Sequence, residues 1–267
     1  NSLLICNGYK DKNYIEMVIL ARKLGKRPIL VIEQIDEVRR IIKAVNKLGA
    51  KPIIGIRSKL SSKSSGRWSQ SSGQNSKFGL SAPEIILTIE ELKEANLLTE
   101  LKLLHFHIGS QISDISVIKD ALQEGSQIFV ELSKLGAPMR YLDVGGGLGI
   151  DYDGSKTSSN NSTNYSLQNY ANDVIATIKD TCELNNIKQP IIISESGRAI
   201  TSHCSIFVFN ILGASNLDIN ADSLLKQNKY NSLIICNLID TLKQIKSINS
   251  KSYDISKIIE LWNDAKK

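Results

Sequence analysis

The amino-acid sequence predicts an α/β fold built on a parallel sheet. Short, nearly continuous apolar runs such as Ile191–Ser194 alternate with longer segments whose apolar residues recur at helical spacing, for example Val38, Ile41, Ile42 and Val45. Such runs are typical of strands that helices cover on both faces. The pattern leaves two architectures open, a doubly wound sheet or most of an eight-stranded barrel. In both, ligands bind at the carboxyl ends of the strands.

The expected elements alternate along the chain. The expected strands are Leu3–Asn7, Pro28–Glu33, Lys51–Arg57, Leu103–Ile108, Tyr141–Val144, Ile191–Ser194 and Ile206–Leu212. The expected helices are Tyr14–Leu24, Ile35–Val45, Pro83–Leu98, Ile115–Leu135 and Leu167–Leu184. Each strand therefore ends close to a loop that leads into a helix, and those loops are where functional residues are expected.

Two segments interrupt this alternation. Ser58–Ser76 is rich in Ser, Gly, Gln and Lys around Arg67 and Trp68, and a loop of this length is either functional or disordered. After Gly213 the chain has neither glycine nor proline, which indicates helices outside the sheet. We therefore expect a partial barrel over residues 1–215 and a helical appendage over residues 216–267.

Composition restricts the class of function. The 267 residues carry a net charge of +6, with lysines scattered among acidic residues, so nucleic acid is not an expected partner. No stretch approaches the roughly 20 apolar residues of a membrane span. The first residues form a strand pattern without a charged leader or an initiator methionine, so we expect no signal peptide and an excerpt of a longer chain. Dispersed cysteines indicate reduced thiols and a cytoplasmic location: Cys6, Cys182, Cys204 and Cys236.

A glycine-rich motif, LDVGGGLGIDYDG, occupies residues 142–154. It is not a dinucleotide fingerprint, because the third glycine of Gly-x-Gly-x-x-Gly would fall on Ile150 or Tyr152. It is not a phosphate-binding P-loop either, because Ser155 intervenes before Lys156. Two interpretations stay open: a nest of backbone amides that holds a phosphate, or a tight turn that packs closely.

Two further strand ends favour the phosphate. HFHIGSQI ends its strand with His107 followed by Gly109 and Ser110, and IIISESGRAI ends with Glu195 followed by Gly197 and Arg198. Amides, a hydroxyl and a guanidinium from these loops would surround one phosphate. Glu195 and His107 would then meet a flat, basic heteroaromatic ring attached to it. Pyridoxal phosphate has that shape.

Several of these residues also have a structural interpretation. Glu195 and Arg198 could form a simple salt bridge, and His105, Asp143 and His203 are expected to be structural. The His105-x-His107 pair also allows a metal-dependent barrel hydrolase, although His203 is the single histidine left to complete its ligands.

At these motifs the sequence resembles the pyridoxal-phosphate-dependent decarboxylases of the alanine-racemase-like barrel type. The resemblance covers roughly residues 3–215 through LLICNGYKDKNYI, SKFGL, LLHFHIGSQI, YLDVGGGLGIDYDGS and ESGRAI. Within that group VGGGLGIDYDGS and SKFGL are most similar to the branch that acts on arginine. The resemblance implies a partial (β/α)8 barrel of the TIM type with a C-terminal helical segment, and decarboxylation of L-arginine to agmatine and CO2 in polyamine and spermidine biosynthesis.

The resemblance also implies roles for individual residues. His107 would lie against the pyridine ring and Glu195 would pair with the ring nitrogen. Arg57 would support the histidine. The phosphate would be held by Ser110, Gly145, Gly146, Gly147, Gly197 and Arg198. The segment implied in substrate binding is Leu142, Asp143, Val144, Gly145, Gly146, Gly147, Leu148, Gly149, Ile150, Asp151 and Tyr152.

Other family features do not map onto this chain. The resemblance places the cofactor lysine on a strand preceding the part aligned with Asn1, and Lys77 belongs to a different motif. It also implies a C-terminal β-domain, a homo-oligomer and Mg²⁺, for which no ligand set can be assigned. We therefore expect the 267-residue chain to be inactive alone. The alternatives are a decarboxylase of another basic amino acid, the metal-dependent hydrolase, or a non-catalytic phosphate-binding or cofactor-binding remnant.

Overall fold

A single parallel sheet organises the computed structural model, which describes residues 2–61, 76–204, 208, 210, 212–213, 233–247 and 261. Its strand order follows the chain, β1-β2-β3-β4-β5-β6, and every neighbouring pair is parallel. The strands are β1 (Leu3–Cys6), β2 (Arg27–Ile32), β3 (Ile53–Arg57), β4 (Leu101–His105), β5 (Tyr141–Asp143) and β6 (Ile191–Ile193).

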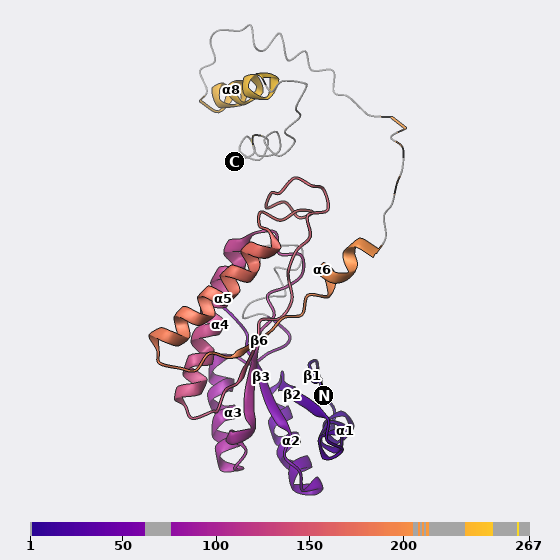
Figure 1. The fold of residues 1–267 in the computed structure, drawn as a ribbon, viewed down its shortest axis with the longest axis vertical. Helices are drawn as coiled ribbons and strands as arrows, with labels where there is room; N and C mark the ends of the chain where they lie inside the picture. The colour runs from indigo at the N-terminus through magenta and orange to yellow at the C-terminus, as the bar shows by residue number, and fades with distance from the viewer. Residues whose placement is uncertain are drawn as a thin grey trace.

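Helices follow the strands in turn (Figure 1). They are α1 (Lys12–Lys23), α2 (Ile35–Leu48), α3 (Ala82–Glu94), α4 (Ile115–Lys134), α5 (Leu167–Leu184), α6 (Gly197–Thr201) and α8 (Leu233–Ser247), with 3-10 turns η3 (Leu98–Glu100) and η4 (Ser202–Cys204). Side-chain caps set several starts: Asp11 accepts from the N–H of Tyr14, and Asp114 accepts from Ser116. Gly49 ends α2 in the left-handed conformation that glycine adopts without steric cost.

The strand order distinguishes the two architectures that the sequence left open. A doubly wound sheet needs a point at which the order reverses, so that helices cover both faces. Here each crossover moves to the next strand in the same direction, and neighbouring helices such as α4 and α5 pack side by side (Figure 1). This is the winding of a (β/α) barrel, so the prediction of a partial TIM-type barrel is confirmed.

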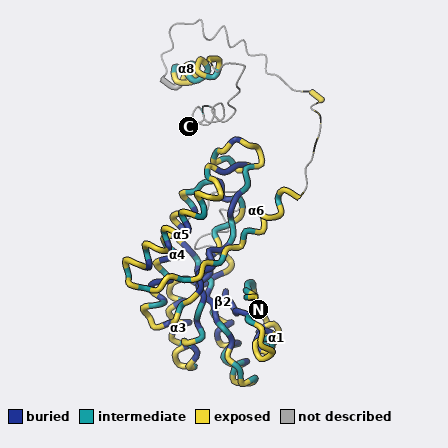
Figure 2. Tube along the Cα trace, viewed as in Figure 1, coloured by how far each residue is buried: buried dark blue, intermediate teal, exposed yellow. Residues whose placement is uncertain are grey.

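Alternation along the strands divides the core into two layers. One set of side chains packs under the helices and includes Leu30, Ile32, Ile54, Ile56, Leu104 and Leu142. The other set points to the concave side of the sheet and includes Ile29, Val31, Leu103 and Tyr141. Figure 2 shows the buried residues concentrated along the strands. Continuing the two-residue period places polar side chains on the concave side at the strand ends: Asn7, Glu33, Arg57, His105, Asp143 and Glu195.

Several expected boundaries differ from the structure. The strand expected to reach Ile108 ends at His105, because its pairing with β3 and β5 ends there, so His107 lies in the loop that follows. The third helix ends at Glu94 rather than Leu98, because Asn96 adopts a positive φ of 55° and a 3-10 turn follows. The short helix α6 was not expected.

Some predictions fall on residues that the structure does not describe. Residues 62–75, with Arg67 and Trp68, lie outside the described part of the chain. Of the expected strand Ile206–Leu212, residues 208, 210 and 212 are described and none is in a strand. Within residues 216–267 the structure describes 233–247, which form α8, and residue 261. The division at residue 216 remains a prediction.

Candidate active site

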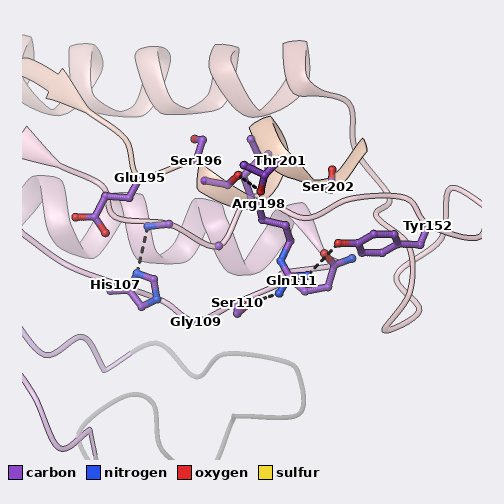
Figure 3. Close-up of a pocket in the computed structure, with 14 residues that line it drawn as sticks. His107, Gly109, Ser110, Gln111, Tyr152, Glu195, Ser196, Arg198, Thr201 and Ser202 are labelled. Atoms are coloured by element: carbon purple, nitrogen blue, oxygen red, sulfur yellow. Dashed lines mark hydrogen bonds between the residues drawn. The ribbon is translucent and has the colours of Figure 1, made fainter. Parts of the chain in front are cut away.

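A cavity of about 530 Å³ lies at the carboxyl ends of β4, β5 and β6 (Figure 3). Its lining residues come from the loop segments 107–111, 146–152 and 195–202. These are the three strand ends that the sequence singled out. A parallel sheet brings the carboxyl ends of neighbouring strands to one edge, which is why segments far apart in sequence share this cavity.

Arg198 connects the three loops. Its Nη2 donates to Oγ of Ser110 at 2.8 Å, and its Nη1 donates to Oη of Tyr152 at 3.0 Å. Gly147 and Gly197 also line the cavity. A guanidinium, two hydroxyls and the backbone of two glycines therefore face one space. This donor set suits a phosphate, which accepts several hydrogen bonds and carries negative charge. The structure thus brings together Ser110, Gly147 and Arg198, and Arg198 does not pair with Glu195 in the described salt bridges.

The three consecutive glycines serve different purposes. Gly145 has φ +67°, and a Cβ there would lie 2.2 Å from the carbonyl oxygen of Phe106. At Gly146 a Cβ would lie 2.9 Å from the carbonyl oxygen of Glu195. What comes close to the chain at these two positions is the backbone of the neighbouring loops, which is the tight-packing interpretation. Gly147, with φ +112°, and Gly146 line the cavity, whereas Gly145 does not.

His107 stands at one side of the cavity as a neutral imidazole. The N–H of Gly146 donates to its Nδ1 at 3.2 Å, so Nδ1 is an acceptor and the proton belongs on Nε2 (Figure 3). Burial lowers the pKa of His107, and the positive charge of Arg57 and the neighbouring His105 lower it further. The ring therefore presents a flat, uncharged surface to the cavity.

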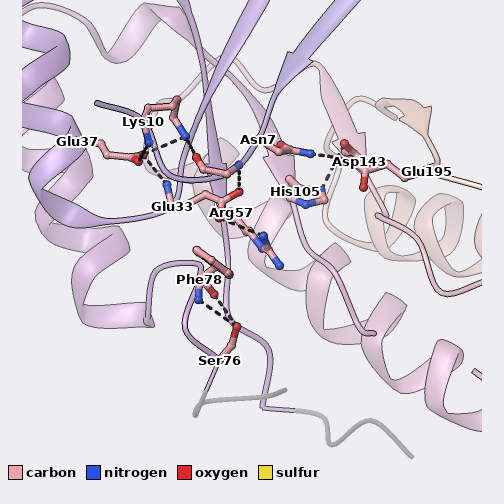
Figure 4. A network of polar contacts seen from close by, with 11 residues as sticks. Asn7, Lys10, Glu33, Glu37, Arg57, Ser76, Phe78, His105, Asp143 and Glu195 are labelled. Atoms are coloured by element: carbon pink, nitrogen blue, oxygen red, sulfur yellow. Dashed lines mark hydrogen bonds and ion pairs between the residues drawn. The ribbon is translucent and has the colours of Figure 1, made fainter. Parts of the chain in front are cut away.

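Glu195 lies beside a buried polar cluster (Figure 4). Its Oε1 accepts from Nδ2 of Asn7 at 2.7 Å, a contact that joins the ends of β6 and β1. Asp143 is fully buried; it accepts from the N–H of Gly145 at 3.0 Å and lies 3.3 Å from Nδ1 of His105. Burial raises the pKa of Glu195, and the carboxylate of Asp143 raises it further.

A second charged cluster occupies the ends of β1, β2 and β3. Nζ of Lys10 lies 3.2 Å from Oε2 of Glu37, with both side chains fully buried, and also donates to the carbonyl of Gly8. Arg57 donates to Glu33 at 3.1 Å, and Phe78 lies under its guanidinium. Arg57 therefore contacts Glu33, and it acts on His107 through its charge. Lys10 is held away from the cavity lining.

Most of the segment Leu142–Tyr152 packs rather than lines the cavity. Within it, Gly146, Gly147, Leu148 and Tyr152 line the space. Leu142, Asp143 and Val144 are buried. The N–H of Gly149 donates to Tyr165, and Asp151 accepts from Ser162.

Two contributors, Gln111 and Asn7, were missed at the sequence level, and Tyr152 was expected only as part of the substrate-binding segment. Gln111 lines the cavity and clamps the glycine-rich loop, since its side chain donates to the carbonyl of Ile150 at 2.6 Å and accepts from the N–H of Ile150 at 3.0 Å. Tyr152 contacts Arg198, and Asn7 contacts Glu195. Asn7 follows a strand, so the same strand-end argument could have found it. The spacing of residues in the sequence does not predict the other two contacts, of Gln111 with Ile150 and of Tyr152 with Arg198.

The structure does not support a metal site on the His105-x-His107 pair. Among the described residues, one group of three possible metal donors lies close together, and it contains His105, Asp143 and Glu195 but not His107. Within that group Nδ1 of His105 lies 3.3 Å from Oδ2 of Asp143. His203 has no place in the group, and it does not line the cavity.

The barrel winding and the phosphate-type cavity at its carboxyl edge define a cofactor-binding (β/α) barrel domain. A family profile described as "Pyridoxal-dependent decarboxylase, pyridoxal binding domain" matches residues 1–202. The chain therefore belongs to the pyridoxal-dependent decarboxylases, through their pyridoxal-binding domain. No described helix is long and apolar enough to cross a membrane.

Individual relatives agree with this assignment. A biosynthetic arginine decarboxylase of Prochlorococcus marinus (strain MIT 9515) is 74% identical over 266 residues, and that of Parasynechococcus marenigrum (strain WH8102) is 58% identical over 267 residues. Both matches cover 100% of this chain and 41% of the relative, so the chain spans less than half the length of these curated relatives.

Two solved structures also match. The biosynthetic arginine decarboxylase of Campylobacter jejuni has a TM-score of 0.66 and 30% identity, over 97% of this chain and 45% of that one. A diaminopimelate decarboxylase from Helicobacter pylori complexed with L-lysine has a TM-score of 0.59 and 28% identity, over 74% of this chain and 45% of that one.

Proposed function

We propose that the full-length protein is a pyridoxal-phosphate-dependent carboxy-lyase that converts L-arginine to agmatine and CO2 in polyamine and spermidine biosynthesis. The arginine decarboxylases that match the whole chain support the reaction. The observation that carries the site is the convergence of Ser110, Gly147 and Arg198 on one cavity with Glu195 and His107 beside them. An anion and an attached flat ring would fit these groups together.

The residues of this cavity fit the cofactor by their chemistry. Arg198, Ser110 and the glycines of the three loops would hold its phosphate, and Tyr152 would steady Arg198. When bound, the cofactor supplies a pyridinium ring that accepts electrons from the substrate α-carbon. Glu195 would keep the ring nitrogen protonated, because an ionised carboxylate next to that nitrogen favours the charged form of the ring.

The remaining residues would orient and shield the ring. His107 would lie against its face as a neutral imidazole, and burial together with the charge of Arg57 would lower the pKa of that imidazole. The cavity-lining part of Leu142–Tyr152 would contact the substrate. The family resemblance proposes a reactive lysine on a strand outside this chain; within the chain, Lys10 is buried against Glu37.

A second candidate is a decarboxylase of another basic or diamino acid, favoured by the match to a diaminopimelate decarboxylase. Release of labelled CO2 by the full-length protein should be measured with arginine, ornithine, lysine and diaminopimelate. We expect arginine to be the best substrate, with kcat/KM higher than for the others by at least about tenfold, or roughly 1.4 kcal/mol. Faster turnover of another amino acid would reassign the substrate. The 267-residue chain should release no CO2.

The role of Glu195 can be tested by Glu195→Gln in the full-length protein. The amide keeps the shape of the side chain but loses its charge. The cofactor should therefore stay bound, while kcat should fall at least about tenfold, which corresponds to roughly 1.4 kcal/mol in the activation barrier. Glu183→Gln is the matched control, because Glu183 is exposed at the end of α5 and bonds Gln189. Unchanged turnover in Glu195→Gln would show that the ring nitrogen meets another group.

The further proposals rest on the resemblance and on composition. We propose a cytoplasmic homo-oligomer; the location agrees with the four cysteines of the described structure, which form no disulfide. Mg²⁺ is proposed from resemblance alone. The described residues do not fit it, since their one close group of three donors includes an imidazole and Mg²⁺ prefers oxygen ligands. No step is assigned to it; activity that survives chelation by EDTA would remove it.

A further inference from the structure

The two acidic side chains at the ends of β5 and β6 lie unusually close together. The ligand atoms of His105, Asp143 and Glu195 all lie within 4.8 Å of one another. Asp143 is fully buried, and its Oδ2 has no hydrogen-bond donor in the described structure besides the ion-pair contact with His105 at 3.3 Å. Two carboxylates this close cannot both carry a full charge without strong repulsion unless a proton or a cation lies between them.

The surroundings supply too little positive charge for two anions. The groups that face Glu195 are Asp143 from β5, His105 from β4 and Asn7 after β1. Asn7 is neutral and donates one hydrogen bond at 2.7 Å. His105 can offset one carboxylate when it is protonated, and it lies against Asp143. Arg198, the guanidinium in the same cavity, is bonded to Ser110 and Tyr152.

We propose that Asp143 and Glu195 form a carboxylate pair that shares one proton, with Asp143 the positioning residue that fixes Glu195 to meet the cofactor's ring nitrogen. The geometry of the pair and the raised pKa of Glu195 agree. This inference rests on the proposed function, because it needs the ring nitrogen at Glu195. When a ligand with a neutral ring binds, the O–H bond of the pair would break, an N–H bond would form on the ring, and both carboxylates would be left ionised beside the ring cation and His105.

The pair predicts how binding depends on pH. Since the pair brings its own proton, the full-length protein should bind pyridoxine 5′-phosphate with little pH dependence above the pKa of the ligand's ring, over the pH range in which the pair keeps that proton. Pyridoxine 5′-phosphate has no aldehyde, so no lysine is needed. Asp143→Asn removes one charge, so Glu195 would be ionised before binding and the proton must come from solution. Affinity of this variant should then fall about tenfold for each unit of rising pH.

Controls isolate the ring nitrogen. The analogue with a C–H in place of the ring nitrogen carries the same phosphate, and its affinity should not show the extra pH dependence in either protein. Asp114→Asn is the matched variant, because Asp114 caps α4 far from the pair in sequence and asparagine caps equally well. Circular dichroism and thermal unfolding check that Asp143→Asn is folded.

The outcomes separate the pair from the proposed function. If the wild type and Glu195→Gln bind the two ligands equally well, Glu195 does not meet a ring nitrogen and the site assignment fails. If Glu195→Gln abolishes the preference for the nitrogen ligand but Asp143→Asn has the same pH dependence as the wild type, the pair alone is wrong.

A measurement on the wild type needs no variant. An infrared difference spectrum should lose a protonated-carboxyl stretch when pyridoxine 5′-phosphate binds. Absence of that band overturns the shared proton even if Asp143→Asn does not fold.

Discussion

At the carboxyl ends of β1, β2 and β3 the edge of the sheet is filled by charged side chains that pair with one another. At the carboxyl ends of β4, β5 and β6 the same edge leaves an open cavity. The first region buries Lys10 against Glu37 and pairs Arg57 with Glu33. The second carries the glycine-rich loops around Arg198. Both regions share one parallel sheet and one winding. The comparison shows that the sheet provides the edge, while the side chains of each loop decide whether that edge is filled or receives a ligand.

Glu37→Gln should produce the largest effect, because it breaks the filled region. Glu37 accepts from Nζ and N–H of Lys10 and from the N–H of Glu33, and it is fully buried. Removing one partner of a buried pair leaves an uncompensated charge and costs about 3–5 kcal/mol of unfolding free energy. Urea unfolding measures the change. Glu16→Gln, in the exposed pair with Lys47, should cost less than about 1 kcal/mol. Equal losses in the two variants would show that burial of Lys10 and Glu37 is not what matters.

Gly145→Ala should come next, because it forces the loops of the open region apart. Its positive φ costs about 1 kcal/mol in an alanine, and the clash with the Phe106 carbonyl brings the loss of unfolding free energy to about 2–4 kcal/mol. Gly154→Ala is the control: φ is +74° there and a Cβ would meet nothing within 4 Å, so only the cost of φ, about 1 kcal/mol, remains. If both variants unfold at the same urea concentration, the close approach at Gly145 is not a constraint.

Tyr152→Phe should weaken phosphate binding in the open region without affecting the fold. Losing the hydroxyl that accepts from Arg198 should cost about 1 kcal/mol of binding free energy, or roughly fivefold in affinity, for pyridoxine 5′-phosphate. Pyridoxine itself, which lacks the phosphate, should bind the variant and the wild type equally. A loss for both ligands would place Tyr152 against the ring instead.

The smallest expected effect is a pH dependence of the free energy of unfolding, and it involves one residue from each region, Arg57 and His107. His107 has a lowered pKa, so below its ordinary value of 6.5 the unfolded chain takes up a proton that the folded chain resists. Stability should therefore fall as pH falls from 6.5, by at most about 1.4 kcal/mol per pH unit for one proton. The slope should be smaller in His107→Gln. Because Arg57 contributes to the shift, Arg57→Met should reduce the slope too. If both variants keep the wild-type slope of stability against pH, another group causes that slope.

The sequence predicted the barrel strands well because a strand buried on both faces must be apolar throughout. Five of the expected strands both begin and end within two residues of the observed ones, and α5 begins and ends at the expected residues. The strand ending in HFH was the exception. Its expected range continues to Ile108 while the strand ends at His105, since a buried residue just after a strand, such as Phe106, looks the same in sequence as a residue within it.

Sequence alone therefore determined the order of most strands and helices, the edge of the sheet where the cavity lies, and the three motifs that line it. These follow from local periodicity and from residue chemistry, which the chain carries without folding. Tertiary structure decided the direction of winding, the bond of Tyr152 to Arg198, the contact of Asn7 with Glu195, and the pairing of Asp143 with its neighbours. Those depend on distances between loops separated by up to 188 residues, and such distances exist only once the sheet has formed.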